Sequence, residues 1–193
     1  MANKSINGVL TITLLIGIMS GCIPAGHLRH VDSETQAPDH HLNATAYISK
    51  FGKLQDDLAI LNQYSNLSEA ERIAQEALNY SAYLAEEYDL VQPAVLHNVF
   101  VRLGFKNRGL CYHWTEDLMR RLKSLELKAY QLHWGVAYRG SELREHNSVV
   151  ITAKDQAFEE GIVLDPWRNS GELYWALVKS DRYPWQELPP SEW

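Results

Sequence analysis

Cysteine, positive charge and long apolar runs are all scarce in this chain. Only two of its 193 residues are cysteine, at positions 22 and 111, so at most one internal disulfide can form. The 18 Lys and Arg residues are outnumbered by 24 Asp and Glu residues. No basic stripe stands out, so nucleic acid is not an expected partner. No apolar run reaches the roughly 20 residues that a membrane-spanning helix needs, so a span is not expected either.

The longest apolar run lies near the start of the chain, over residues 9–19, and follows Lys4. It leads into Met19-Ser20-Gly21-Cys22, which resembles the bacterial lipobox, where a small pair precedes a cysteine that is lipidated and becomes the mature N-terminus. We therefore expect residues 1–21 to be a lipoprotein signal peptide and Cys22 to carry lipid, which makes a membrane the expected partner. An ordinary signal peptide, or an anchor helix, with an incidental cysteine is the alternative.

The residue after this cysteine is Ile23 rather than Asp. By the sorting rule of lipoproteins in Gram-negative bacteria, this implies a place in the cell envelope, at the outer membrane and facing the periplasm. Lipid on the Cys22 sulfur would also leave Cys111 as a lone thiol in an oxidising compartment. Such a thiol is either a small buried hydrophobe or a nucleophile.

Residues 22–45 are rich in Pro, Gly, His, Asp and Ser and show little periodicity, which is typical of a flexible tether. A metal site on the histidines of this segment is conceivable. Neither a cysteine cluster nor a fixed scaffold accompanies them, however, so we expect no bound metal. The histidines concerned are His27, His30, His40 and His41.

The remaining residues, 46–193, are enough for one domain with a substantial core. Apolar residues at three- and four-residue spacing predict helices in its first part, and a two-residue period predicts strands after them. This order favours an α+β fold in which N-terminal helices pack on a small antiparallel sheet. The expected helices cover 46–64, 68–88, 93–103 and a segment from residue 111, the expected strands cover 127–138, 146–152 and 161–165, and a short helix at 170–177 precedes an irregular tail at 183–193.

Three residues with the chemistry of a thiol nucleophile stand at the ends of these elements. Cys111 opens a predicted helix, His146 begins a predicted strand, and Asp165 ends the next strand. A helix N-terminus and a nearby imidazolium both activate a thiol, and Asp165 could fix the tautomer of His146. His113 and His133 are competing bases, although His113 would point away from Cys111 on the helix and His133 lies in the middle of a strand.

The segments around these residues resemble the transglutaminase-like branch of the papain-like fold. They are Gly109-Leu110-Cys111 opening a helix, His146 leading an apolar strand, and Leu164-Asp165-Pro166 closing one. The resemblance covers roughly residues 92–178 and implies that Cys111 is the nucleophile, His146 the general base and acid, and Asp165 the orienting group. Members hydrolyse amide bonds or transfer acyl groups to amines, and some have lost activity.

The resemblance also implies an oxyanion hole made by the backbone N–H of Cys111 and an upstream side chain. Asn107 is the candidate for that side chain, with Tyr112 or His113 behind it. Phe105 stands where a papain-like protein has Gln, which favours a transferase or an inactive relative over a protease.

Aromatic side chains next to these motifs could form the wall of a peptide or sugar site. The candidates are Tyr112, Trp114 and Trp167. We expect an envelope-anchored cysteine hydrolase or acyltransferase that acts on an amide of a peptide, a protein or peptidoglycan and needs no cofactor. A non-catalytic lipoprotein that uses the same fold as a binding module is the alternative, and a His-rich metal-binding protein is a third hypothesis.

Overall fold

The computed structural model describes residues 40–61 and 67–193, except for the side chains of residues 40–43. The expected signal peptide, the lipidation site Cys22 and most of the expected tether lie outside these residues. Within the described part, no helix is both long and apolar enough to cross a membrane.

Four α-helices and one five-stranded antiparallel sheet account for most of the described residues, which confirms the expected α+β class. The strand order is β4-β3-β2-β1-β5. The helices are α1 (His40–Leu61), α2 (Leu67–Glu87), α3 (Ala94–Arg102) and α4 (Cys111–Lys123); the strands are β1 (Tyr130–Ala137), β2 (His146–Ala153), β3 (Ile162–Asp165), β4 (Tyr174–Leu177) and β5 (Trp185–Leu188); the short 3₁₀ helices are η1 (Phe158–Glu160), η2 (Val178–Ser180) and η3 (Pro190–Glu192).

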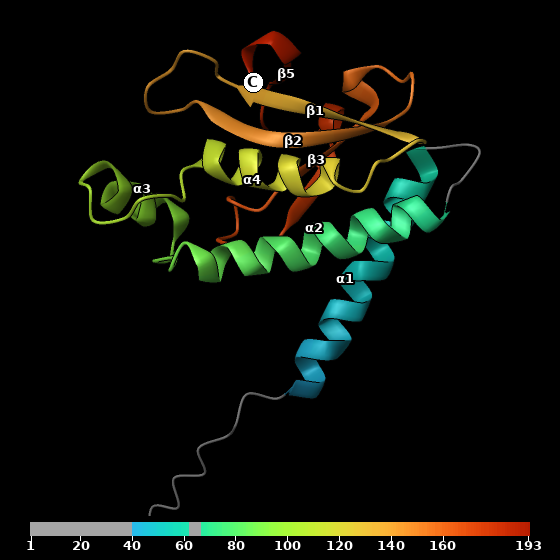
Figure 1. Ribbon diagram of the computed structural model, residues 1–193, viewed down its shortest axis with the longest axis horizontal. Coiled ribbons are helices and arrows are strands. Elements are labelled where there is room, and N and C mark those ends of the chain that lie inside the picture. Colours follow the sequence, from blue (N-terminus) through green and yellow to red (C-terminus); the bar gives the residue numbers. More distant parts are fainter. Residues whose placement is uncertain (1–39, 62–66) are drawn as a thin grey trace, which may run out of the picture. The chain divides into compact units, whose positions relative to one another are not determined.

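Helix α4 lies along one face of the sheet, and α2 lies on the same side of the sheet and packs against α4 (Figure 1). Residues four apart share a helix face, and α4 buries Trp114, Leu118 and Leu122 at that spacing. Basic side chains, among them Arg121 and Lys123, fill its last turn, where the helix dipole favours cations. The apolar stripe of α4 therefore faces the core and sets the direction in which its N-terminus points.

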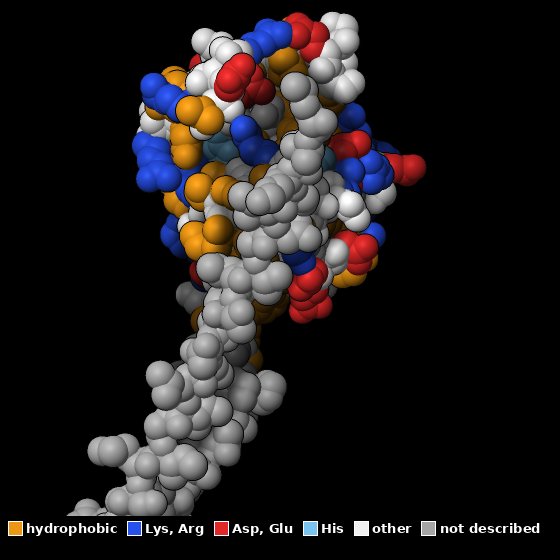
Figure 2. Space-filling view, turned by 90° about the vertical axis from the view of Figure 1, so that its left-hand side faces the viewer, with side chains coloured by type: hydrophobic (Ala, Val, Ile, Leu, Met, Phe, Trp, Pro, Cys, Tyr) orange, Lys and Arg blue, Asp and Glu red, His pale blue; other side chains and the backbone are white. Residues whose placement is uncertain are grey.

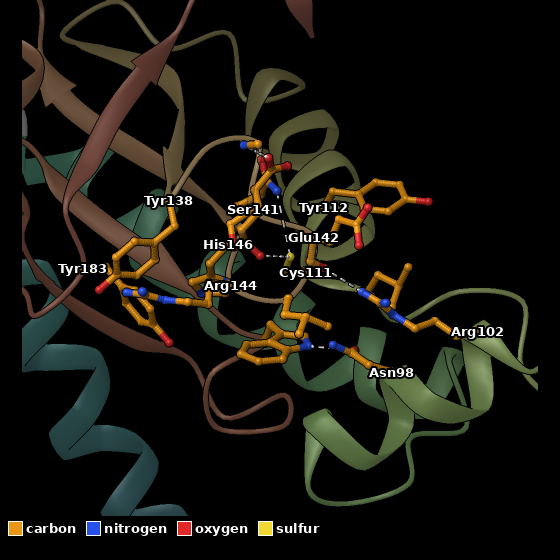
Figure 3. Close-up of a pocket in the computed structure, with 16 residues that line it drawn as sticks. Asn98, Arg102, Cys111, Tyr112, Tyr138, Ser141, Glu142, Arg144, His146 and Tyr183 are labelled. Carbon is orange, nitrogen blue, oxygen red and sulfur yellow. Dashed lines mark hydrogen bonds between the residues drawn. The ribbon is translucent and has the colours of Figure 1, made fainter.

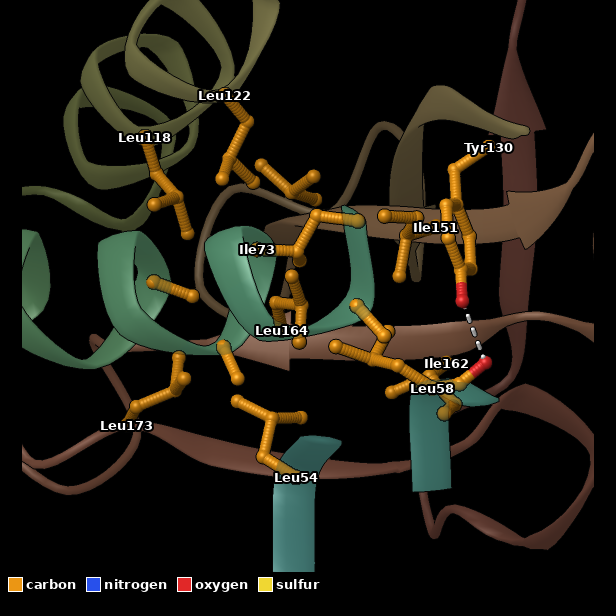
Figure 4. Packing of buried hydrophobic residues seen from close by; sticks show 14 of the residues in the cluster. Leu54, Leu58, Ile73, Leu118, Leu122, Tyr130, Ile151, Ile162, Leu164 and Leu173 are labelled. Atoms are coloured by element: carbon orange, nitrogen blue, oxygen red, sulfur yellow. Dashed lines mark hydrogen bonds between the residues drawn. The ribbon is translucent and has the colours of Figure 1, made fainter. Parts of the chain in front are cut away.

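A hydrophobic cluster lies on each face of the sheet, because successive residues of the fully buried strand β2 point to opposite sides. The larger cluster, on the helical side, joins Leu58 of α1 and Ile73 of α2 to Leu118 of α4 and Ile151 of β2 (Figure 4). The Tyr130 hydroxyl also donates a hydrogen bond of 2.9 Å to the Leu58 carbonyl oxygen. The smaller cluster contains Ala137, Val150, Phe158, Val163, Val178 and Trp185.

The sequence-based prediction of a short helix at residues 170–177 was wrong. Ser170 and Gly171 both have positive φ angles, of 56° and 95°, so the chain turns there instead of starting a helix. Residues 174–177 then form strand β4, which pairs with β3 at the edge of the sheet. The aromatic residues Tyr174 and Trp175 suit a half-buried sheet surface better than a helix.

The sequence suggested an irregular tail at 183–193, but part of this tail is a strand. Residues 185–188 form β5, which pairs antiparallel with β1. This strand is only four residues long and lies between Pro184 and Pro189, so its own sequence carries no strand signal. Pairing with β1 makes it a strand, which is a tertiary effect.

The other elements agree with expectation except at their ends. Helix α1 begins at His40 instead of at residue 46, so the last part of the expected tether is helical. Helix α4 begins at Cys111, as the sequence indicated, and β2 begins at His146. The two elements that matter most for the site are therefore those that the sequence defines best.

Candidate active site

A cleft of about 650 Å³ lies where the N-terminus of α4 meets the start of β2. Cys111 and His146 face each other in it, and Tyr112, Tyr138 and Tyr183 line its walls (Figure 3). Strand β3 brings Asp165 to the buried side of His146. The structure thus brings together the three residues that the sequence singles out.

The segment before α4 is pinned at several points, and this fixes where Cys111 lies. Gly109 has a φ angle of +119° and sits so close to His97 that any Cβ would overlap the imidazole. The backbone N–H groups of Gly109 and Leu110 donate to Nδ1 of His113, at 3.1 and 3.2 Å. The Trp114 indole N–H donates to the Gly109 carbonyl oxygen at 2.9 Å. Cys111 is therefore held as the first residue of the helix.

His146 is buried, and its imidazole interacts with the side chains of Asp165 and Cys111. Its Nε2 is 2.6 Å from Oδ2 of Asp165, which is fully buried. Burial alone would lower the pKa of His146, but hydrogen bonds with Asp165 and Cys111, together with their charges, raise the pKa to about 9. His146 is therefore held as an imidazolium at neutral pH, the form that stabilises a thiolate beside it.

Aromatic rings surround the buried side of the imidazole. The ring centroids of Trp167, Tyr183 and Trp185 lie 4.8, 4.9 and 5.4 Å from that of His146. These rings exclude water from His146 and restrict the directions in which it can turn. Trp167 is itself fixed, since its indole N–H donates to Oδ1 of Asn98 on α3 at 3.1 Å.

A buried chain of charges continues from Asp165. Its carboxylate accepts bonds from the backbone N–H and from Nε of Arg168, at 3.1 and 3.0 Å. The same guanidinium makes a two-fold bond to Asp181, at 2.8 and 2.7 Å. Burial alone would raise the pKa of Asp181, but Arg168 and the indole N–H of Trp185 lower it. Two carboxylates thus compensate the two cations, His146 and Arg168.

Cys111 is half-buried and has further polar neighbours besides His146. Its Sγ lies 3.9 Å from the carbonyl oxygen of Glu145 and 3.9 Å from Nδ2 of Asn147. The Glu145 carbonyl oxygen can accept the proton of a neutral thiol, whereas the Asn147 NH₂ group donates a hydrogen bond to the sulfur. Asn147 is therefore the hydrogen-bond donor of the two neighbours.

Two of the residues predicted for the site lie elsewhere. Trp114 was expected to bind substrate, but it is fully buried and packs edge-on against Tyr88. It cannot touch a ligand, because its position at the fourth residue of α4 turns it toward the core. Asn107, the candidate oxyanion donor, lines a separate hollow with Tyr88 and Asp117, not the cleft of Cys111. Tyr112 and Trp167 do line that cleft.

The competing bases have other partners. His113 uses Nδ1 to accept two backbone N–H groups, and burial and Arg108 lower its pKa, so it is a neutral structural group. Both ring nitrogens of His133 are engaged, with Glu187 at 2.6 Å and Thr152 at 2.9 Å. Neither histidine lines the cleft.

Several residues that the sequence did not single out shape the site. Asn147 follows His146 directly and lines the cleft, Trp134 of β1 binds Asn147, and Arg168 of the turn after β3 binds Asp165. In the described part of the chain, no group of three or more His, Cys, Asp or Glu residues could hold a metal ion. The side chains of all four histidines considered for a metal, His27, His30, His40 and His41, lie outside that part.

The mouth of the cleft opens beside α3, which contributes Asn98 and Arg102 to its lining. The face of the molecule that carries α3 shows hydrophobic side chains together with Lys and Arg (Figure 2). Exposed apolar residues there include Val95, Leu96, Val99, Leu103 and Phe105. These apolar residues do not line the cleft, so its rim is polar on α3 and charged on the loop between β1 and β2.

No protein-family model, no curated protein and no solved structure matches this chain. What the site can do therefore follows from its own geometry: a thiol at a helix N-terminus, an imidazolium, a buried carboxylate and a cleft large enough for a ligand.

Proposed function

We propose that this protein is a cysteine hydrolase or acyltransferase that acts on amide bonds through Cys111, His146 and Asp165. The observation that carries the proposal is the hydrogen-bonded order of these groups: Asp165 binds one ring nitrogen of His146, and Cys111 interacts with the same imidazole. Since Nε2 faces Asp165, the other ring nitrogen, Nδ1, is left for the sulfur.

The acyl-transfer chemistry follows from this arrangement. The thiol proton is already held by His146 in its imidazolium form, and the electron pair of the Cys111 sulfur forms a bond to the carbonyl carbon of the substrate. The π electrons of the carbonyl move to its oxygen and give a tetrahedral oxyanion. When the oxyanion collapses, the carbon–nitrogen bond breaks and His146 returns the proton to the leaving amine. Water or an amine then releases the acyl group from Cys111.

The fold and the setting of the reaction are part of the same proposal. A nucleophile at a helix N-terminus and a His–Asp pair on neighbouring antiparallel strands are what the papain-like resemblance implies, and the arrangement of α4, β2 and β3 supports it. Lipidation at Cys22, which the sequence motif predicts, would hold the enzyme in a bacterial envelope. A peptide, a protein or peptidoglycan is then the substrate class within reach.

The test measures thiol chemistry without a known substrate. The full chain is treated with iodoacetamide near pH 7, and separately with p-nitrophenyl acetate, whose burst of nitrophenolate reports acylation of the thiol. We expect rapid modification at one site and a stoichiometric burst. Both should disappear in Cys111→Ala and persist in Cys22→Ala, which removes the other cysteine.

A slow, burst-free reaction in the unchanged protein would show an inert thiol and would sink the proposal. The non-catalytic binding module would then remain. Circular dichroism of Cys111→Ala is the control for folding, and we expect it to match the unchanged protein because the side chain is half-buried and small.

A further inference from the structure

Asn147 reaches the reacting sulfur from the strand that carries the base. It is the second residue of β2 and is 8% exposed. Since neighbouring residues of a strand point to opposite faces, Asn147 turns toward α4. Its Nδ2 lies 3.9 Å from the Cys111 sulfur, and it lines the cleft.

The orientation of this amide is fixed by a tryptophan. The Trp134 indole N–H lies 2.7 Å from Oδ1 of Asn147. An indole nitrogen is only a donor, so the oxygen of the amide must face Trp134. The NH₂ group must then face Cys111. Trp134 is held in turn by its place in β1, where it pairs with Val149, so that Asn147 is its diagonal neighbour on the same face.

We propose that Asn147 Nδ2 and the backbone N–H of Cys111 form the oxyanion hole of this site, with Trp134 as the positioning residue. The inference rests on the proposed acyl-transfer function. As the first residue of α4, Cys111 has a backbone N–H without an intrahelical acceptor. The oxygen of an attacked carbonyl is two bonds from the sulfur, so a donor that already contacts the sulfur is within reach of that oxygen.

This assignment replaces the donor expected from the sequence. Asn107 lies in the hollow lined by Tyr88 and Asp117, and it does not line the cleft. Asn147 has the three properties that a donor needs: it is buried, it is oriented by a second group, and it borders the reacting atom.

The test compares two reactions of the same thiol. Alkylation by iodoacetamide displaces iodide and forms no oxyanion, whereas acylation by p-nitrophenyl acetate passes through one. We expect Asn147→Ala in the full chain to slow the acylation burst by on the order of 100-fold. Its iodoacetamide rate should stay within about three-fold of the unchanged protein. Trp134→Phe keeps the amide but frees it to turn, so it should slow acylation selectively and by less.

Each other outcome has a definite meaning. Equal loss of both rates, or no loss of either, in a folded Asn147→Ala would overturn the oxyanion assignment while leaving the nucleophile in place. If that variant fails to fold, the same comparison of acylation rate with alkylation rate in Trp134→Phe decides. A larger selective loss in Asn107→Ala would return the role to the rival donor. Absence of both reactions in the unchanged protein is the distinct result that defeats the proposed function itself.

Discussion

His146 is nearly fully buried and yet is held in its charged form, because its interactions with Asp165 and Cys111 raise its pKa more than burial lowers it. The sequence could predict the pairing with Asp165, since His146 begins one strand and Asp165 ends the neighbouring strand. The sequence could not predict that Arg168 binds Asp165, because this contact depends on how the turn after β3 folds back. The partner Asp181 lies thirteen positions further along, beyond strand β4.

The raised pKa of His146 makes stability depend on pH in a defined direction. Its pKa rises from 6.5 to about 9 on folding, so its contribution is complete below about pH 6.5 and is lost as the pH rises through about 9. The loss should be on the order of 3 kcal/mol. Urea unfolding at pH 6 and pH 9.5 measures it. In His146→Gln the difference between the two pH values should shrink sharply, and an unchanged difference would contradict the assignment.

At the scale of elements, the entry into α4 decides where the nucleophile lies. The sequence indicated this helix start through the apolar spacing after Cys111. It gave no sign that His97, from α3, would pack against Gly109 and that His113 would bind the backbone before the helix. Those contacts depend on how α3 folds back on α4. The short edge strands β4 and β5 escaped prediction for a similar reason, since pairing with β3 and β1 defines them.

We predict that Gly109→Ala disturbs the site through this helix entry. A Cβ there would overlap the His97 imidazole, and the φ angle of +119° is one that L side chains rarely adopt. The variant should lose roughly 2–4 kcal/mol of stability and react more slowly with iodoacetamide. Gly104→Ala is the matched control, because Gly104 also has a positive φ angle but has open space around it. It should lose less stability and keep the thiol rate; equal effects in both variants would argue against the His97 contact.

At the scale of the whole molecule, the core and the site occupy different places. The large cluster joins α1, α2 and α4 to the helical face of the sheet, whereas the cleft lies at the end of α4 and the start of β2. The core could be predicted in outline from helical spacing, which places Leu54, Leu58 and Ile73 on inward faces. The second cluster, under β5, could not, because it depends on a strand that the tail gave no reason to expect.

We therefore expect a core substitution to change stability without changing thiol chemistry. Leu58→Ala should lower the free energy of unfolding by about 2–5 kcal/mol, because Leu58 is fully buried in the large cluster. Ile60→Ala, in the same helix but 78% exposed, should change it by less than about 1 kcal/mol. Urea unfolding gives both values. At low temperature the iodoacetamide rate of Leu58→Ala should match that of the unchanged protein, and a marked fall would show that core and site are coupled.

The chain of charges that begins at His146 has a consequence for protein engineering. A graft that moved only Cys111, His146 and Asp165 onto another scaffold would carry over the reacting groups. It would leave behind Arg168 and Asp181, which hold the carboxylate in place and balance its charge. The host would then have to bury Asp165 without the guanidinium that binds it, at a cost of several kcal/mol. In this protein the transferable set of charged groups therefore includes five residues, contributed by α4, strands β2 and β3, the turn after β3 and the segment that leads into β5.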